Sequence, residues 1–325
     1  MMDTMALLST LRARDVKVWV EEDRLRFSAP AGAIDADMRM TLTQRKEEIL
    51  SFLTRADALK NAPASIVPIK PEGFRPPVFA LSGHGGDVYA LLPLARSLDA
   101  GQPVLGVQPP GLDGSEPLTT VEALARYELE QIRKVQPNGP YHLIGHCAGG
   151  TLAFEAAQQL IAAGEKVALL ALIGSPFPTM FRKTPQMCVY LANHARALAT
   201  GTLGERTKYV RSKLQQRFEE KEPPPEGSAQ LLAHRSRVER ATVIAASNYQ
   251  PKRYPGEIHL FITAEQWHRT NSWRALARTA REHVIAGMGV DERLQGPNVA
   301  VLANEVQRVL NEIESGDNTA SKLAG

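Results

Sequence analysis

Residues 144–151 read IGHCAGGT, and this octapeptide constrains the fold of the chain more than any other stretch. The apolar run YHLIG leads into it, and GGTLAFEAAQQL follows with the composition of a helix. A strand, a sharp glycine-flanked turn and a helix form a nucleophile elbow, in which the central side chain is exposed above a sheet. We therefore expect a parallel α/β sheet with Cys147 at the tip of such an elbow.

Cys147 has a simpler explanation, because free cysteines are often small buried residues. That explanation accounts for neither Gly145 nor Gly149, which let the backbone pass closely through the turn. The N-terminus of the following helix also carries a partial positive charge that favours a thiolate. We therefore interpret Cys147 as a nucleophile and expect the Ala148 N–H to stabilise the oxyanion of its reaction.

From Val78 onward, short apolar strands alternate with helices, which predicts a mostly parallel sheet covered on both faces. A helical insertion at about 180–250, with the proline-broken stretch EEKEPPPEGSAQ, is typical of a lid. The amphipathic segment NVAVLANEVQRVLNEI predicts a closing helix, and residues 313–325 are expected to form a disordered tail.

The first 56 residues form a separate unit by pattern. A helical segment precedes VKVWVEEDRLRFSAP, which alternates around a charged turn as a hairpin does, and two short helices follow, the first capped by Asp35. Repeated prolines in residues 57–75 predict an extended linker. We therefore expect a small α+β domain at 1–56, a linker at 57–75 and a large α/β domain at 76–312.

Composition excludes several classes of partner and site. With 38 basic and 35 acidic residues, the net charge of +3 gives no reason to expect nucleic acid, and no apolar run is long enough for a membrane span. The two cysteines form no disulfide framework, and the N-terminal sequence lacks a secretory signal. We expect a cytoplasmic protein with free thiols, no membrane partner and no metal.

The segment VQPNGPYHLIGHCAGGTLAFEAAQQLIAAGEKVALLALIGSP resembles the nucleophile segment of thioesterase domains from nonribosomal-peptide and polyketide assembly lines, and VFALSGHGGDVYALLPLARSL resembles their oxyanion-loop region. The resemblance implies an α/β-hydrolase fold with a helical lid. Residues 1–56 are similar to tubulysin-type docking domains, which implies that the hairpin edge receives the C-terminal peptide of a partner synthetase by strand addition.

Two positions depart from the family pattern. Where the family carries an aspartate after the strand that follows the nucleophile helix, the sequence LIGSP has Gly174. Where the family has a histidine before the closing helix, the resemblance places Asn298, in GPNVAVL. An asparagine amide cannot take a proton near neutral pH. The catalytic triad is therefore predicted to be incomplete.

Other residues are candidates to replace the missing groups. His84, in the loop SGHGGD, is either an oxyanion-loop residue and possible base or a packing residue. His268 and Glu265, in TAEQWHRTN, follow a strand end, where they are a possible substitute base and acid. Four residues are given structural roles: His146, His283 in the helical-looking RTAREHVIAG, Cys188 and Asp291.

A thiol without its base favours thioester exchange over hydrolysis, because hydrolysis needs water to be deprotonated. The chain is similar to cysteine enzymes of this fold that shuttle aminoacyl groups between carrier proteins. We therefore expect acyl or aminoacyl transfer through Cys147, with carrier proteins as partners and no cofactor bound directly, since the phosphopantetheine thioester belongs to the carrier. Two alternatives remain open: a chain-releasing thioesterase or cyclase, and a non-catalytic docking protein.

Overall fold

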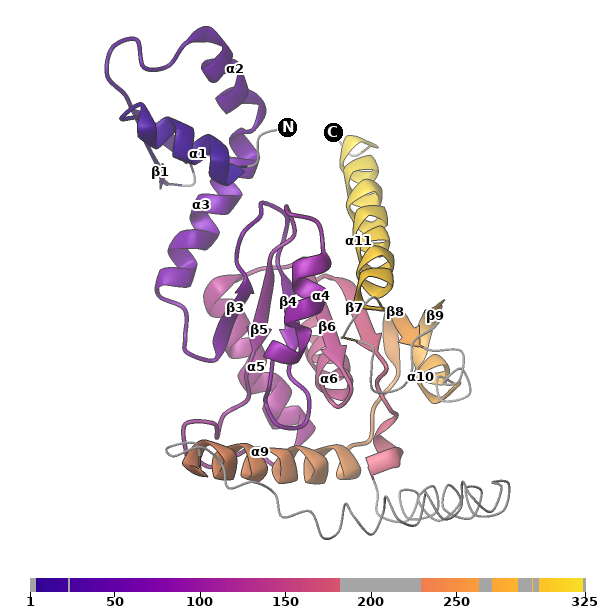
Figure 1. Ribbon diagram of the computed structural model, residues 1–325. Coiled ribbons are helices and arrows are strands. Elements are labelled where there is room, and N and C mark those ends of the chain that lie inside the picture. Colours follow the sequence, from indigo (N-terminus) through magenta and orange to yellow (C-terminus); the bar gives the residue numbers. More distant parts are fainter. Residues whose placement is uncertain are drawn as a thin grey trace, which may run out of the picture.

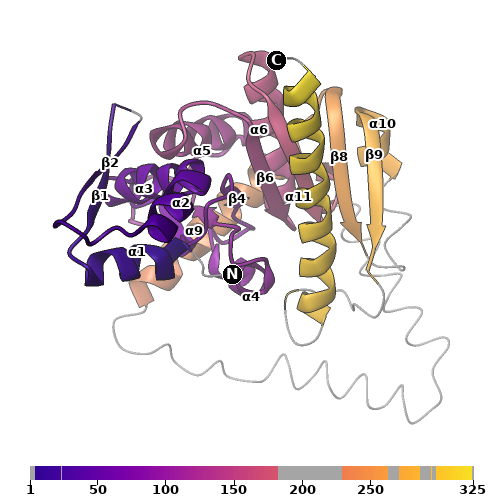
Figure 2. The same cartoon turned by 90° about the horizontal axis from the view of Figure 1, so that it is seen from above.

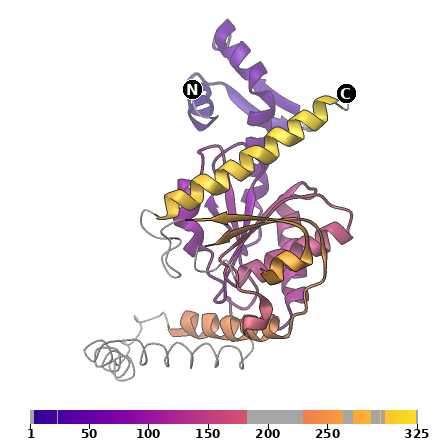
Figure 3. The same cartoon turned by 90° about the vertical axis from the view of Figure 1, so that its right-hand side faces the viewer.

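The structure is a computed structural model that describes residues 4–22, 24–181, 229–262, 271–285, 294 and 298–323. Within these ranges the strands form two sheets, a two-stranded hairpin and a larger sheet of seven strands. Figure 1 shows the N-terminal helices and helix α9 at opposite ends of the molecule, and Figure 3 shows the same arrangement from the side.

The N-terminal unit has the predicted order of helix, hairpin, helix and helix. Its elements are α1 (Thr4–Ala13), β1 (Lys17–Glu21), β2 (Arg24–Ser28), α2 (Ala36–Gln44) and α3 (Lys46–Lys60). The Asp35 side chain caps α2 by accepting a hydrogen bond from the Met38 N–H, as its position predicted. A small core of Leu7, Leu11, Val16, Leu42 and Ile49 holds the unit together. Figure 2 shows the hairpin at the outer edge of this unit.

The large sheet has the strand order β3-β5-β4-β6-β7-β8-β9. Its strands are β3 (Ile66–Lys70), β4 (Val78–Leu81), β5 (Val104–Val107), β6 (Tyr141–His146), β7 (Val167–Ile173), β8 (Tyr254–Ile262) and β9 (Ala277–Val284). Every neighbouring pair is parallel except β3 and β5, which are antiparallel. The sheet is therefore mostly parallel, as the alternation of strands and helices predicted.

Helices cover both faces of this sheet. Phe79, Leu81 and Leu143 point into an apolar cluster shared with α5 (Val121–Val135) and α6 (Gly149–Ala162). Val78, Ala80 and Ile144 point to the other face, where α4 (Leu92–Ser97) and α11 (Asn298–Leu323) pack. Because successive strand residues alternate between faces, strands buried on both sides read as continuous apolar runs. The fold is the α/β-hydrolase arrangement expected from the sequence.

The residues expected to form a linker, 57–75, instead contribute to both domains. Helix α3 extends to Lys60, and β3 adds a strand at the edge of the described sheet, where its neighbour is β5. Pro68 lies within β3, next to a change of register. An edge strand tolerates proline because the missing N–H faces away from the ladder. Of the prolines in this range, Pro68 therefore lies in an edge strand and not in a linker.

Two further expectations differ from the structure. The segment around His283 looked helical, but it forms β9, which pairs in parallel with β8 from Tyr254 to Ile262. Pairing with a neighbouring strand overrides weak local preference. Helix α11 also continues to Leu323, through residues that were expected to form a disordered tail.

Arg55 connects the N-terminal unit to the large domain. Its guanidinium is buried and donates hydrogen bonds to the carbonyl oxygens of Arg75, at 3.0 Å, and Gly73. Burial lowers the pKa of Arg55 to about 10. The Ser51 hydroxyl donates a third bond, of 3.0 Å, to the Phe74 carbonyl. Helix α3 is therefore anchored to the chain segment that enters the large sheet.

Candidate functional site

The elbow predicted from IGHCAGGT joins β6 to α6. Cys147 has a φ of 53°, a left-handed conformation that a side chain bearing Cβ rarely adopts. Strain of this kind persists where the surrounding structure holds it in place, and it is typical of nucleophiles in elbows. The Cys147 side chain is partly exposed. The structure therefore gives Cys147 the backbone geometry that the sequence predicted.

The glycines of the elbow allow backbone contacts that no larger residue would permit. A Cβ at Gly149 would lie 2.5 Å from the Leu81 carbonyl oxygen and 2.6 Å from that of Ser82. A Cβ at Gly145 would collide with the backbone of Gly149. The start of α6 is therefore pressed against the end of β4, and the loop after β4 begins beside Cys147.

Helix α6 begins immediately after Cys147, with Ala148 at its N-cap position. Ala148 is buried and caps the helix, and none of the hydrogen bonds among the described residues uses its N–H. The first N–H groups of a helix carry a partial positive charge, which stabilises a thiolate and an oxyanion. The Ala148 N–H therefore has the surroundings expected of an oxyanion donor, and its role stays a prediction.

The loop after β4 holds His84 next to the elbow. Its turn is closed by a hydrogen bond of 3.2 Å from the Gly86 N–H to the Gly83 carbonyl, and Gly86 has a φ of 72°. Burial lowers the pKa of His84 below its ordinary value, while the charge of Glu239 acts in the opposite direction. The imidazole is therefore mainly neutral near pH 7, and its function as base or oxyanion-loop residue stays a prediction.

Gly174 immediately follows β7 and lies beside the elbow. It has a φ of 53°, and its N–H donates a hydrogen bond of 2.8 Å to the Phe261 carbonyl. The next residue, Ser175, places its hydroxyl 3.3 Å from the Gly145 carbonyl, and Trp273 Nε1 donates to the Ser175 carbonyl at 3.0 Å. The slot that the resemblance assigns to an acid therefore has no side chain.

The other candidates lie at different places. Asn298 is the first residue of α11, so it lies at a helix start after the end of β9. His146 is the last residue of β6. His283 donates or accepts hydrogen bonds with His259, at 3.0 Å, and with Glu305, at 2.7 Å, between β8, β9 and α11. Glu265, His268, Asp291 and Cys188 lie outside the described residues.

Helix α9 (Ala229–Asn248) lies over the elbow and the loop after β4, and sequence reasoning missed its contacts. Ala246 packs against Ala148. Arg235 forms an ion pair of 3.0 Å with Asp87 in the loop after β4. No local pattern signals this pairing, because the two residues are 148 positions apart in the chain.

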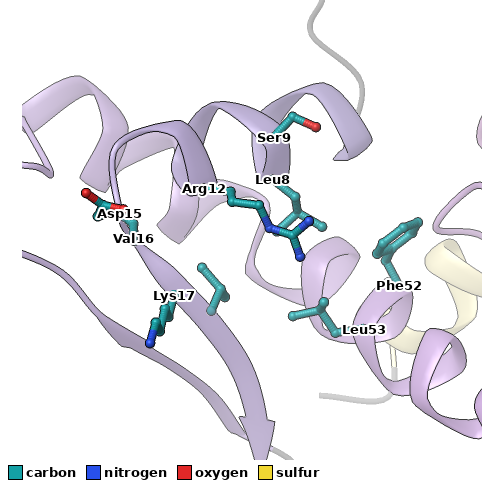
Figure 4. A pocket seen from close by; sticks show the side chains of 9 residues that line it. Leu8, Ser9, Arg12, Asp15, Val16, Lys17, Phe52 and Leu53 are labelled. Carbon is teal, nitrogen blue, oxygen red and sulfur yellow. The ribbon is translucent and has the colours of Figure 1, made fainter.

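A second candidate site lies in the N-terminal unit. A groove of about 680 Å³ opens between α1, β1 and α3. Figure 4 shows its lining, which combines apolar side chains with charged ones: Leu8, Ser9, Arg12, Asp15, Val16, Lys17, Val18, Phe52 and Leu53. The hairpin also exposes Trp19 and Phe27 to solvent. This surface therefore combines apolar side chains with two basic residues and one acidic residue.

Metal and membrane sites are not found in the described parts of the chain. No group of three or more His, Cys, Asp or Glu side chains is placed there to hold a metal ion. Among the described helices, none is long and apolar enough to cross a membrane.

Comparison with protein families gives two matches. The family described as "Thioesterase domain" matches residues 76–316, and the family described as "TubC N-terminal docking domain" matches residues 5–55. Among curated proteins, malpibaldin synthetase of Mortierella alpina is 41% identical over 130 residues, which are 39% of this chain and 2% of that protein. Indigoidine synthase of Dickeya dadantii is 40% identical over 134 residues, 40% of this chain and 9% of that protein. The chain therefore spans less than a tenth of these relatives.

Solved structures show the same fold. The NocB thioesterase domain, in covalent complex with a fluorophosphonate nocardicin G analog, superimposes with a TM-score of 0.56 at 20% identity, covering 75% of this chain and 99% of that one. A four-domain nonribosomal peptide synthetase bound to AMP and glycine gives a TM-score of 0.59 at 18% identity, covering 80% of this chain and 21% of that one. At these identities the likeness shows the fold of the large domain.

Proposed function

Because the chain belongs to the thioesterase domain family, we propose that it transfers an acyl group between carrier-protein thioesters through a thioester on Cys147. The observation that carries the proposal is the pairing of a thiol at the elbow with Gly174 beside it. A thiol such as that of Cys147 is a suitable nucleophile for thioester exchange. The position next to it that would carry the acid of a triad is Gly174, which has no carboxylate.

The proposed reaction has two symmetrical halves. The Cys147 thiolate attacks the carbonyl carbon of an acyl-pantetheine thioester, and the N–H groups of Ala148 and the loop after β4 stabilise the oxyanion. The bond from carbon to the pantetheine sulfur then breaks, and that sulfur leaves as a thiolate that takes up a proton. In the second half, the thiolate of another carrier attacks the Cys147 thioester and restores the free cysteine.

Energetics favour transfer over release. Each half exchanges one thioester for another, so the products have nearly the same free energy as the reactants. Hydrolysis requires general-base assistance, which contributes roughly 10²–10⁴-fold to a rate. A base without an orienting carboxylate supplies less of this factor. The acyl-enzyme is therefore expected to persist in water and to react with thiols.

Chain release is the second candidate, and His84 is the observation that favours it. Its imidazole lies in the loop beside the elbow, and burial keeps it mainly neutral, which is the form that accepts a proton. The charge of Glu239 on α9 acts in the opposite direction to burial and favours the protonated imidazole. In this alternative, His84 activates water and the acyl group leaves as a free acid or ring.

One experiment separates the two. The purified protein is acylated with S-acetyl-N-acetylcysteamine, and the adduct is followed by intact mass after dilution into buffer with or without excess pantetheine. Transfer predicts a stable adduct in buffer that disappears when the thiol is added. Rapid loss in buffer alone, with acetate as the product, would establish release. An adduct that also forms on Cys147→Ala would place the chemistry elsewhere.

For the N-terminal unit we propose the docking of a partner synthetase's C-terminal peptide along β1. The match to the docking family and the groove between α1, β1 and α3 support this assignment. Among the strands that the structure describes, β1 pairs with β2 alone, so its other edge offers backbone groups for an added strand. Arg12 and Lys17 beside the groove favour a peptide that carries carboxylates.

A further inference from the structure

Arg235 of α9 holds the loop that follows β4. Its Nη2 lies 3.0 Å from Asp87 Oδ2, and the guanidinium also covers Gly85, where an added Cβ would lie 3.9 Å from the Arg235 Nε and Nη2 atoms. The contact therefore joins a helix residue 148 positions later in the chain to the loop beside Cys147.

Asp87 uses its two oxygens in different directions. Oδ2 faces Arg235, while Oδ1 accepts a hydrogen bond of 2.8 Å from the Tyr89 N–H at the start of the next helical turn. The loop is also held by the Gln108 side chain, which donates to the Gly86 carbonyl at 3.3 Å. The carboxylate of Asp87 thus links the end of the loop both to the helical turn that follows it and to α9.

From these contacts we infer that Arg235 is a positioning residue for the oxyanion loop of the Cys147 reaction. The inference rests on the proposed function. Oxyanion donors accelerate a reaction only when they are held in place before the negative charge develops. Three of the six residues between Ser82 and Asp87 are glycine, and glycine-rich backbone has wide conformational freedom. The ion pair between Arg235 and Asp87 therefore restricts a loop whose own sequence allows many conformations.

The same helix provides a matched control. Arg237, two residues further along α9, forms an ion pair of 3.2 Å with Glu116 on a different loop. Both arginines are partly exposed and both pair with a carboxylate, but Arg237 has no ion pair with the loop after β4 among the described contacts. Arg235→Gln and Arg237→Gln therefore remove similar ion pairs from the same helix, and only the first touches the proposed machinery.

The first measurement is amide hydrogen exchange of the peptides that cover residues 82–89. Arg235→Gln is expected to raise exchange there, Arg235→Lys to restore part of the protection, and Arg237→Gln to leave it as in the wild type. Equal exchange in wild type and Arg235→Gln would contradict the inference that Arg235 restricts this loop. This measurement needs no substrate, so it stands even if the proposed function fails.

The second measurement compares two reactions of Cys147. Acylation by S-acetyl-N-acetylcysteamine forms an oxyanion, whereas alkylation by iodoacetamide displaces iodide at carbon without one. Arg235→Gln is expected to slow acylation about tenfold relative to alkylation, since small displacements of catalytic groups cost up to roughly 10²-fold. Arg237→Gln should leave the ratio unchanged. An unchanged ratio in Arg235→Gln would overturn the positioning role, and a wild type that is alkylated but never acylated would overturn the proposed function instead.

Discussion

The Cys147 N–H donates a hydrogen bond of 3.1 Å to the carbonyl oxygen of Ile173, the last residue of β7. This bond brings Cys147 next to Gly174, the residue that follows Ile173 in the chain. A side chain introduced at Gly174 would therefore start from a position adjacent to the elbow. The absence of a carboxylate there is a property of this sequence that substitution can reverse.

Restoring the two degenerate positions is expected to convert a stable acyl-enzyme into one that hydrolyses. Asn298→His alone should raise hydrolysis only slightly, because the new imidazole lacks an orienting carboxylate. The double variant with Gly174→Asp should raise it more than either single change, since triad members act as a unit. The measurement is the half-life of the acetyl adduct by intact mass.

The control for that experiment is Gly174→Asn. Both substitutions place a Cβ at a φ of 53°, which costs about 1 kcal/mol of folding free energy, but only aspartate adds a charge. If Gly174→Asn with Asn298→His hydrolyses as fast as the aspartate pair, the carboxylate is not responsible. If the wild type already matches the double variant, another base is at work.

The groove between α1, β1 and α3 is lined by two basic residues and one acidic residue, and we expect docking there to depend on charge. Arg12→Glu with Lys17→Glu should weaken binding of an acidic C-terminal peptide from a partner synthetase by tenfold or more, because two attractive charges become repulsive. Lys46→Glu changes an exposed lysine of the same unit that does not line the groove. Fluorescence anisotropy of a labelled peptide at low salt measures the effect. Equal weakening by Lys46→Glu would show a general charge effect and contradict groove binding.

The buried His259 side chain is expected to make the protein less stable in weak acid. Burial lowers the pKa of His259 to about 4, with the charge of neighbouring His283 acting in the same direction. The unfolded chain binds this proton below pH 6.5, so unfolding takes up a proton between pH 6.5 and 4, and stability falls as pH falls through that window. The loss amounts to about 3 kcal/mol at most.

Replacing the imidazole tests this assignment. His259→Gln should be less stable than the wild type at pH 7, because it loses the contact with His283, but its stability should fall less between pH 6.5 and 4. Urea unfolding at several pH values measures both quantities. If the free energy of unfolding depends on pH in the same way in both proteins, another group is responsible for the loss of stability in acid.

Replacement of Glu128 is expected to stabilise the protein. It is fully buried in α5, and neither carboxylate oxygen has a hydrogen-bond partner among the described residues. Burial raises its pKa well above the ordinary value, so unfolding releases a proton above pH 4.5 and stability falls as pH rises. Glu128→Gln replaces the titratable carboxyl group with an amide that does not ionise. The free energy of unfolding should therefore rise by at least about 1 kcal/mol at pH 8.

The exposed Glu130, on the same helix, provides the control. Glu130→Gln should change the free energy of unfolding by less than about 0.5 kcal/mol, as is usual for surface substitutions. A gain for Glu128→Gln that is equally large at pH 5 and pH 8 would contradict the titration argument, because the effect would then not depend on ionisation.

Local chemistry explains which features could be read from residues alone. The elbow needs two glycines between a strand and a helix that directly follow one another in the chain, so IGHCAGGT and its flanks predict both the turn and the position of Cys147. The hairpin and the Asp35 cap are also short-range features. In each of these, the interacting groups are neighbours in the chain, and residue type restricts their conformation directly.

Contacts between distant segments required the folded chain. Pro68 lies in a strand because β5 is there to pair with it, and the segment around His283 is a strand because β8 is there. Arg235 reaches Asp87 across 148 positions, and no periodicity or motif in either segment records that distance. Residue types set what each segment can form, but packing selects which distant groups meet. For this reason the sequence predicts the nucleophile, while the helix and ion pair that hold the loop beside it depend on the folded arrangement.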